Sequence, residues 1–416
     1  MQRRELEAKG YLVTPGFIDL HAHLREPGFE ESETIVSGAQ AALRGGFTTI
    51  CAMPNTEPAI DSPGLVAEVI ARGSVAAAAR VLPIATITRA RAGRELADLM
   101  ELASAGAIAF SDDGSPVADA SLFRHALEYA RMKDLLIIEH AQDLTLSGKG
   151  VMHEGSVSAR LGLPGVPAAA EESAVSRDIA LAEMTGARVH LTHISTRGAI
   201  ASIRDAKARG LRVTCDVTPH HLSMTEDWVA GQRGFAWERE GHGREAPLAR
   251  KPPARAVPYD SSTKVNPPLR SSSDVRALWE GLSDGTVDAI ATDHAPHASI
   301  RKDVEFDQAA FGISGLETAL SLVLGGVAAG WCDHDTVIRA LTSGPARVLG
   351  IPLPTEDWIA IDPDIAWTVT AESLTSMGKN TPLLGRTLRG RVVYAVVSGD
   401  VRYEGGLRGA TPVGSR

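Results

Sequence analysis

The sequence predicts an α/β fold, a TIM-type (β/α)8 barrel with a small β appendage built from the C-terminal segment. Three observations support this prediction: eight short apolar runs, helical stretches between most of them, and alternating apolar and polar residues near the end of the chain. The chain has 416 residues, a length that suits one large barrel with an appendage.

The eight apolar runs are short, often β-branched and bounded by Gly, Pro or polar residues, which is typical of buried parallel strands. They are Gly16–Leu20, Thr48–Ala52, Val81–Thr86, Ala107–Phe110, Leu135–Ile138, Ala187–Thr192, Leu211–Val217 and Asp288–Ala291. Helix-like segments lie between most of these runs, at 33–44, 64–72, 95–105, 122–133, 174–185 and 198–208. Strands and helices that alternate in this way predict a (β/α)8 barrel.

We expect three parts along the chain. Residues 1–14 are expected to be the remnant of an N-terminal β segment, residues 15–350 the barrel, and residues 351–416 the β appendage and tail. Within the barrel, about 227–264 is rich in Gly, Arg, Pro and Glu without clear periodicity. We interpret it as an inserted surface loop, with the stretch Arg250–Arg255 in solvent.

The composition disfavours several classes of protein. Hydrophobic residues make up 44% of the chain, so a large core can form, and the net charge of −9 disfavours nucleic-acid binding. Three cysteines without a CxxC pair disfavour disulfides and a thiolate zinc site. We find no signal peptide, and the longest apolar run, Ala319–Trp331, is too short and glycine-rich to span a bilayer. We therefore expect a cytoplasmic protein in which this run is a core helix.

Residues that can bind metal follow four of the apolar runs. His21 and His23 end the first run, where residues i and i+2 of a strand point to the same face. Such a pair alone is more often two satisfied, half-buried histidines than a metal site. Here His140, His193 and Asp293 stand at three more strand ends, which converge on the active-site face of a barrel. Imidazoles with carboxylates suit zinc that keeps a position open for water, so the pattern predicts a zinc centre.

Eight phrases, in this order along the chain, carry a family resemblance. They are PGFIDLHAHLREPG at 15–28, GGFTTICAMPNTEP at 45–58, AFSDDGSPV at 109–117, HISTRGA at 193–199, VTPHHL at 217–222, KVNPPLR at 264–270, ATDHAPH at 291–297 and GISGLETAL at 312–320. With these phrases the chain resembles the bacterial type I dihydroorotases of the amidohydrolase superfamily, from about Pro15 to about Gly405. The resemblance implies a metallohydrolase barrel.

The resemblance also implies a set of metal ligands for one or two zinc ions. The first ion would be bound by His21, His23 and Asp293, and the second by His140 and His193. An aspartate of the Asp112–Asp113 pair would bridge the two, and the spacing in the family points to Asp113. Many relatives use a carbamylated lysine as the bridge. No lysine ends the fourth run, which counts against a hydantoinase.

The substrate contacts follow from the same resemblance. Arg25 and Asn55 would hold the substrate carboxylate, with His297 as a third partner and His23 beside them; guanidinium can bind a planar carboxylate through two hydrogen bonds. Taken alone, Arg25 would be a surface salt-bridge residue and Asn55 a turn residue. Contacts to the ring amides are expected from Asn266, Phe311 and Gly312. His220 and His221 are equally favoured as residues that orient a metal ligand and as simple loop residues. The segment 298–310 is a candidate lid over the substrate.

The implied reaction is the reversible, zinc-dependent hydrolysis of L-dihydroorotate to N-carbamoyl-L-aspartate in pyrimidine (UMP) biosynthesis, with Asp293 moving the proton. The alternatives are another cyclic amidohydrolase (an allantoinase or hydantoinase), a non-catalytic dihydroorotase-like subunit of an aspartate transcarbamoylase complex, and a pure binding module. Beyond the small-molecule substrate, the expected partners are further copies of the chain or aspartate transcarbamoylase. Only twenty residues precede His21, so we also expect an unpaired edge on the tail strands.

Overall fold

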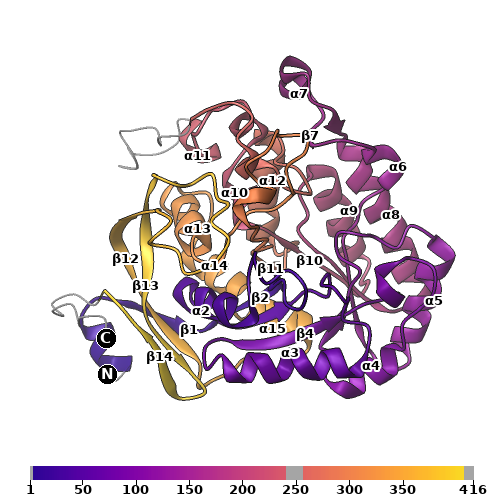
Figure 1. Ribbon diagram of the computed structural model, residues 1–416, viewed down its shortest axis with the longest axis horizontal. Helices are drawn as coiled ribbons and strands as arrows, with labels where there is room; N and C mark the ends of the chain where they lie inside the picture. Colours follow the sequence, from indigo (N-terminus) through magenta and orange to yellow (C-terminus); the bar gives the residue numbers. More distant parts are fainter. Residues whose placement is uncertain (1–2, 240–255, 407–416) are drawn as a thin grey trace.

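The computed structural model describes residues 3–239 and 256–406. A barrel of parallel strands surrounded by helices occupies most of the molecule, and a four-stranded antiparallel sheet stands at one side of it, next to α1 (Arg3–Ala8), the first described helix (Figure 1). The stretch Arg250–Arg255, which we expect in solvent, lies outside the described residues.

The barrel sheet has eight parallel strands in the order β11-β10-β9-β6-β5-β4-β3-β2, and each strand coincides with one of the predicted runs. The strands are β2 (Phe17–Ala22), β3 (Phe47–Ala52), β4 (Arg80–Ala85), β5 (Ala109–Phe110), β6 (Leu136–Glu139), β9 (Arg188–Leu191), β10 (Val213–Val217) and β11 (Ala289–Ile290). The first and last strands meet where the His23 amide donates to the His294 carbonyl over 2.8 Å. The predicted barrel is therefore confirmed.

Helices surround the barrel, and all six predicted helical stretches overlap one of them. They are α2 (Ile35–Gly45), α3 (Pro63–Val75), α4 (Leu99–Ala105), α5 (Ala120–Arg131), α8 (Ala168–Thr185), α9 (Arg197–Ala208), α12 (Ser272–Asp284), α13 (Ala319–Ala328), α14 (His334–Leu341) and α15 (Ser343–Leu349). Between β6 and α8 the chain makes an excursion through α6 (Leu144–Ser147), β7 (Met152–His153), α7 (Ser156–Leu161) and β8 (Gly165–Val166). The core helix predicted within Ala319–Trp331 is α13, and no helix in 3–239 or 256–406 is long and apolar enough to cross a membrane.

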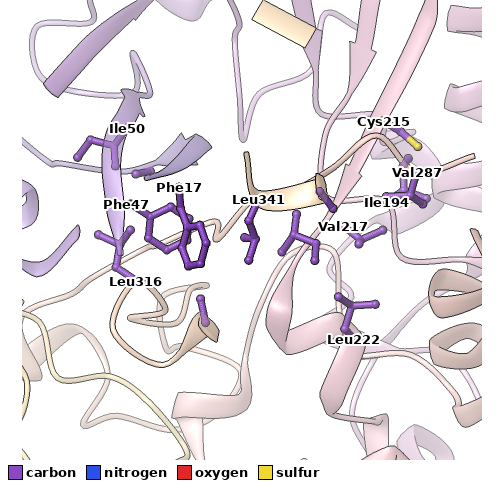
Figure 2. Close-up of a cluster of buried hydrophobic side chains, with 14 of the residues drawn as sticks. Phe17, Phe47, Ile50, Ile194, Cys215, Val217, Leu222, Val287, Leu316 and Leu341 are labelled. Atoms are coloured by element: carbon purple, nitrogen blue, oxygen red, sulfur yellow. The ribbon is translucent and has the colours of Figure 1, made fainter. Parts of the chain in front are cut away.

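The hydrophobic core lies mainly between the barrel strands and the surrounding helices. Figure 2 shows part of this layer, in which the rings of Phe17 and Phe47 meet edge to face with centroids 5.7 Å apart. A second cluster of buried residues contains Ile18 and Leu20, the neighbours of Phe17 on the same strand. Because both faces of β2 are buried, the strand is a nearly continuous apolar run, and its two polar residues, Asp19 and His21, need partners inside the protein.

The appendage sheet has the order β1-β12-β13-β14, formed by β1 (Leu12–Pro15), β12 (Trp358–Thr368), β13 (Thr387–Val397) and β14 (Asp400–Glu404). Strand β1 pairs with β12 from Leu12 opposite Ile361 to Pro15 opposite Trp358. The expectation of an unpaired edge is therefore wrong over this part of β12, because four residues directly before the barrel suffice to cover it. Helix α1 (Arg3–Ala8) places the buried side chain of Leu6 in a small core with residues of β12 and β13.

The interpretation of 227–264 as a surface loop is wrong at its beginning. Trp228, Phe235 and Trp237 are buried with at most 5% of their surface exposed, and they stack in sequence with ring centroids 5.5 and 4.9 Å apart. Trp228 lies in helix η2 (Glu226–Trp228), Trp237 lies in helix α11 (Ala236–Arg239), and Phe235 directly precedes α11. Aromatic burial in a segment without periodicity leaves no pattern in the sequence, which explains the error.

Candidate active site

Four imidazoles and two carboxylates meet at the carboxyl ends of the barrel strands. His21 lies in β2, and each of the other five follows a strand end by one to three residues: His23 after β2, Asp113 after β5, His140 after β6, His193 after β9 and Asp293 after β11. All six side chains are buried, with at most 6% of any residue's surface exposed. The structure thus brings together every residue that the sequence predicted as a metal ligand.

One group of donor atoms is formed by His21, His23 and one oxygen of Asp113. The two Nε2 atoms are 3.2 Å apart, and they lie 3.4 and 3.6 Å from Asp113 Oδ2. Asp293 Oδ1 lies 3.1 Å from His23 Nε2 and 3.5 Å from His21 Nε2. Four donors from three strand ends therefore face a common point.

The second group uses the other oxygen of the same carboxylate. Asp113 Oδ1 lies 3.5 Å from His140 Nδ1 and 3.3 Å from His193 Nε2, and these two nitrogens are 3.0 Å apart. Asp113 therefore belongs to both groups, one oxygen to each, as a residue that bridges two metal ions would.

The spacing of the donors fits zinc. A tetrahedral zinc ion with bonds of about 2.0–2.1 Å holds its ligand atoms about 3.3–3.4 Å apart. The separations within both groups, 3.0 to 3.6 Å, scatter around that value. The charges fit as well: burial alone would lower the pKa of His21, yet Asp113 and Asp293 raise it to about 10, so this position stabilises a positive charge.

Oxygen acceptors behind the imidazoles orient three of the four rings. His21 Nδ1 lies 2.8 Å from Thr192 Oγ1, His23 Nδ1 lies 2.8 Å from Asn55 Oδ1, and His140 Nε2 lies 2.7 Å from Gln142 Oε1. Because Asn55 and Gln142 present carbonyl oxygens, the rings donate to them, and the nitrogen that faces the centre keeps its lone pair. Metal-binding histidines are commonly oriented in this way.

Of the two neighbouring aspartates, Asp113 faces the histidines and Asp112 does not. Asp112 Oδ1 accepts the amides of Ile87 and Thr88 over 2.9 and 3.1 Å, and its Oδ2 accepts the Thr88 hydroxyl. The guanidinium of Arg91 donates to the Asp113 carbonyl from the other side. These bonds fix the turn that presents Asp113 to both donor groups.

Two buried aspartates hold the strand ends that carry His193 and Asp293. The backbones of His193 and Asp293 are left-handed, with φ of 41° and 45°. Asp216 accepts the His193 amide over 2.7 Å and the Thr192 hydroxyl over 3.0 Å. Asp19 accepts the amide of Thr292 over 2.8 Å and its hydroxyl over 2.5 Å. A non-glycine residue at positive φ is strained, so these carboxylates offset the strain at two candidate ligands.

The residues predicted to bind substrate lie beside this centre. Arg25, whose pKa burial lowers to about 10, donates from Nε to the Pro296 carbonyl over 3.1 Å, and its Nη2 lies 3.4 Å from His297 Nε2. His297 Nε2 in turn lies 2.7 Å from the Phe311 carbonyl. Burial, followed by Arg25, lowers the pKa of His297 to about 3, so His297 is neutral and donates to that carbonyl.

The other predicted contacts already have partners within the protein. Asn266 Nδ2 donates to Gln142 Oε1 over 2.8 Å, and Asn55 orients His23. The Gly312 amide donates to the Lys264 carbonyl over 2.9 Å, so this N–H is not free to bind a ring amide. Substrate contact by Gly312 therefore depends on its carbonyl.

Several neighbouring groups belong to the scaffold. His221 lies between Thr218 Oγ1 and the Pro267 carbonyl, 2.8 and 3.0 Å away, and neither His220 nor His221 belongs to the two donor groups. Burial raises the pKa of the thiols of Cys51 and Cys215, which fits inert packing residues. The candidate lid 298–310 is tied down by the Lys302 ammonium, which donates to three carbonyls, and its movement stays a prediction.

Five residues that support the site were not singled out from the sequence: Asp19, Gln142, Thr192, Asp216 and Asn380. An acidic residue inside an apolar strand was a usable signal for Asp216, which interrupts the run Val213–Val217. Gln142 and Asn380 lie in connections without a local pattern, and only the folded chain brings them to the mouth of the barrel.

Comparisons with solved structures agree with the barrel fold. L-Hydantoinase (dihydropyrimidinase) from Arthrobacter aurescens superposes with a TM-score of 0.79 at 23% identity, covering 96% of this chain and 87% of that one. A D-hydantoinase from Thermus sp. superposes with a TM-score of 0.73 at 21% identity, covering 96% and 86%. Likenesses at this identity show the fold alone.

Comparison of sequences is more specific. A family profile described as dihydro-orotase-like matches residues 10–199. The dihydroorotases of Anaeromyxobacter dehalogenans (strain 2CP-C) and Pelotomaculum thermopropionicum are each 49% identical to the chain; the alignments cover 97% and 95% of it, and 89% and 88% of those proteins. The dihydroorotase of Geobacter metallireducens is 44% identical over 96% of the chain and 89% of its own length.

The dihydroorotase relatives, together with the barrel and its cluster of histidines and aspartates able to bind metal, define an enzyme of the cyclic amidohydrolase class. Within that class, the chain belongs to the dihydroorotase family.

Proposed function

We propose that the chain is a zinc-dependent dihydroorotase that reversibly hydrolyses L-dihydroorotate to N-carbamoyl-L-aspartate, a cytoplasmic step of pyrimidine biosynthesis. One observation carries the proposal: two groups of zinc-type donors share the Asp113 carboxylate, and three of the four imidazoles are oriented from behind. Nearly full-length identity of 44–49% to named dihydroorotases supports the choice of substrate.

The ligand roles follow the two groups of donor atoms. His21, His23 and Asp293 would hold the first ion, His140 and His193 the second, and Asp113 would contact both. When bound, zinc supplies Lewis acidity that makes water nucleophilic near neutral pH and polarises a carbonyl.

Asp293 is placed to move the proton. Burial would raise the pKa of its carboxyl, but His23 and His21 hold the pKa below its ordinary value, so the group is ionised at neutral pH. An ionised carboxylate at this position can take a proton from the attacking water and return it to the ring nitrogen that leaves.

Arg25 and His297 would bind the substrate carboxylate. The guanidinium of Arg25 is largely buried, and its pKa of about 10 keeps it charged at neutral pH. In the described part of the chain no carboxylate forms an ion pair with Arg25, so its guanidinium can bind an anion, and its fork can donate two hydrogen bonds. Asn55 would contribute its Nδ2, while its Oδ1 orients His23.

An assay can distinguish the proposed dihydroorotase from an enzyme that acts on another cyclic amide. No lysine follows β5, where the chain reads Ser111-Asp112-Asp113-Gly114, so the carbamylated lysine of many relatives has no counterpart here. Assembly with aspartate transcarbamoylase or into a homo-oligomer stays a prediction from the family resemblance.

The test is a substrate panel on purified protein. Zinc-loaded protein is expected to hydrolyse L-dihydroorotate, to lose this activity when a chelator removes the metal, and to regain it with zinc. Allantoin and hydantoin serve as controls. Preference for either control, or no turnover by folded protein that contains zinc, would overturn the proposal.

A further inference from the structure

Asn380 reaches the mouth of the barrel from the appendage. It lies in the connection between β12 and β13, far in sequence from any barrel strand, and only 6% of its surface is exposed. We propose that Asn380 is a positioning residue that holds the substrate-binding wall formed by His297, Phe311 and Gly312. This inference rests on the proposed function and deepens it.

The amide of Asn380 joins two segments that run side by side after β11, 294–297 and 311–314. Its Oδ1 accepts the amide of His297 over 2.8 Å and lies 2.9 Å from the hydroxyl of Ser314, which shares its single hydrogen with the Gly378 carbonyl 2.7 Å away. Its Nδ2 donates to the carbonyls of Ala295 and Gly312, both over 3.0 Å. Each of the two amide atoms thus contacts both segments.

These four bonds use all the hydrogen-bonding capacity of the Asn380 side chain, since a primary amide has two donor hydrogens and an acceptor oxygen with two lone pairs. The side chain therefore has nothing left for a substrate. Its effect has to pass through His297 and Gly312, which lie on the side of the wall where the ring and carboxylate are expected.

Few other bonds set the distance between the two segments. The Ala295 amide donates to the Ile313 carbonyl over 2.8 Å, and the His297 ring donates to the Phe311 carbonyl over 2.7 Å. The second bond belongs to the wall itself. Without Asn380, the ties behind the wall are the parallel bridge between His294 and Ile313, which includes the bond at Ala295, and the Gly315 amide, which donates to His294 Nδ1 over 3.1 Å.

The connection that carries Asn380 is itself anchored to the barrel. Glu317 accepts the amides of Thr375 and Ser376 over 2.8 to 3.1 Å, and Glu33 accepts the Ser376 hydroxyl and the Met377 amide. At Gly378 a Cβ atom would lie 2.6 Å from the His297 amide nitrogen, so the connection packs directly against the wall. A rigidly anchored support of this kind can fix the geometry of a binding site.

The experiment compares Asn380→Ala and Asn380→Asp with the wild type. We expect either substitution to raise KM for L-dihydroorotate about tenfold or more at pH 8, because several buried hydrogen bonds are lost, while kcat changes less than about threefold. Zinc content should stay at the wild-type level, since Asn380 contacts none of the metal-type donors. Ser373→Ala is the matched control, because Ser373 lies in the same connection and, among the described residues, its hydroxyl bonds only to the backbone of Thr370.

Asn380→Asp adds a readout that general loosening of the structure would not reproduce. Its carboxylate would face the carbonyls of Ala295 and Gly312, whereas the protonated acid can donate to one of them. The KM defect of this variant should therefore shrink as pH falls from 8 to 6, relative to Asn380→Ala. Ser314→Ala removes one hydroxyl, which lies 2.9 Å from Asn380 Oδ1 and 2.7 Å from the Gly378 carbonyl. It should raise KM by a smaller factor, and it covers the case that both Asn380 variants fail to fold.

The positioning role would be overturned if the folded Asn380 variants had the KM of the wild type. If the Asn380 variants do not fold, a wild-type KM in Ser314→Ala would overturn it. Either result would leave the proposed function intact. A loss confined to kcat or to zinc content would overturn the positioning role too. Absence of L-dihydroorotate turnover in the wild type would instead overturn the proposed function, together with the inference that rests on it.

Discussion

Thr192→Val removes a single hydroxyl that links two candidate metal ligands. Thr192 Oγ1 lies 2.8 Å from His21 Nδ1, and its hydrogen is donated to Asp216 over 3.0 Å. Asp216 also accepts the His193 amide. Valine has nearly the same shape, so the substitution leaves the packing in place and removes only the two hydrogen bonds.

The expected effects follow from these contacts. Thr192 is buried, with 1% of its surface exposed, so His21 Nδ1–H would lose its acceptor in a place that water does not reach. An unsatisfied buried donor costs about 1–3 kcal/mol, and the lost bond to Asp216 adds about 1 kcal/mol. Loss of a residue that orients a metal-bound histidine typically lowers metal affinity about 10–100-fold. We therefore expect a loss of about 2–4 kcal/mol in unfolding free energy and zinc binding weakened within that range.

Two assays measure this. Competition with a chromophoric chelator gives the zinc affinity, and guanidinium unfolding of the metal-free protein gives the stability. Thr214→Val is the matched control, because Thr214 Oγ1 bonds to His190 Nδ1 over 2.8 Å, one step further from the centre. Zinc affinity of Thr192→Val within threefold of that control would refute the reasoning.

Three further predictions concern the proton carrier, the wall and pH. Asp293→Asn should lower kcat by about 10²–10⁴-fold with the fold retained, because the proton acceptor is lost; a circular dichroism spectrum checks the fold, and near-normal turnover would contradict the role. Gly312→Ala should destabilise the protein by about 2–4 kcal/mol, measured by thermal unfolding, because φ is 138° and the new Cβ would lie 2.6 Å from that of Ala295; an unchanged melting temperature would contradict this. Burial, with acidic neighbours, raises the pKa of half-buried Glu226 to about 7, so the folded state binds more protons than the unfolded state between pH 4.5 and 7, and stability falls as pH rises through that window. Glu226→Gln should therefore gain about 1 kcal/mol over the wild type at pH 8, after allowance for solvent screening, and clearly less at pH 5; an equal gain at both values would rule out titration as its cause.

The predicted ligands meet because strand ends in a barrel converge. His21, His140, His193 and Asp293 each stand at or just past an apolar run, and the order of parallel strands brings such positions to one rim. The choice of Asp113 over Asp112 came from the family resemblance. Its physical reason is visible only in the fold, where the amides of Ile87 and Thr88 hold Asp112.

Other parts of the site had no local signal. Asn380 is one polar residue in a connection, and the sequence does not say that the appendage folds back against the barrel mouth. The sequence predicted a surface loop where the aromatic residues Trp228, Phe235 and Trp237 are buried. The segment around them is rich in Gly and Arg and has no periodicity that would indicate burial.

The sequence by itself determined the barrel and the residues that face its centre, because strand periodicity and parallel topology place strand ends on one rim whatever the details of packing. The tertiary structure alone decided how those residues are oriented. Ring tautomers, the strained backbones of His193 and Asp293, and the support of the wall by Asn380 depend on hydrogen bonds between segments distant in the chain, and such pairings appear only when the chain has folded.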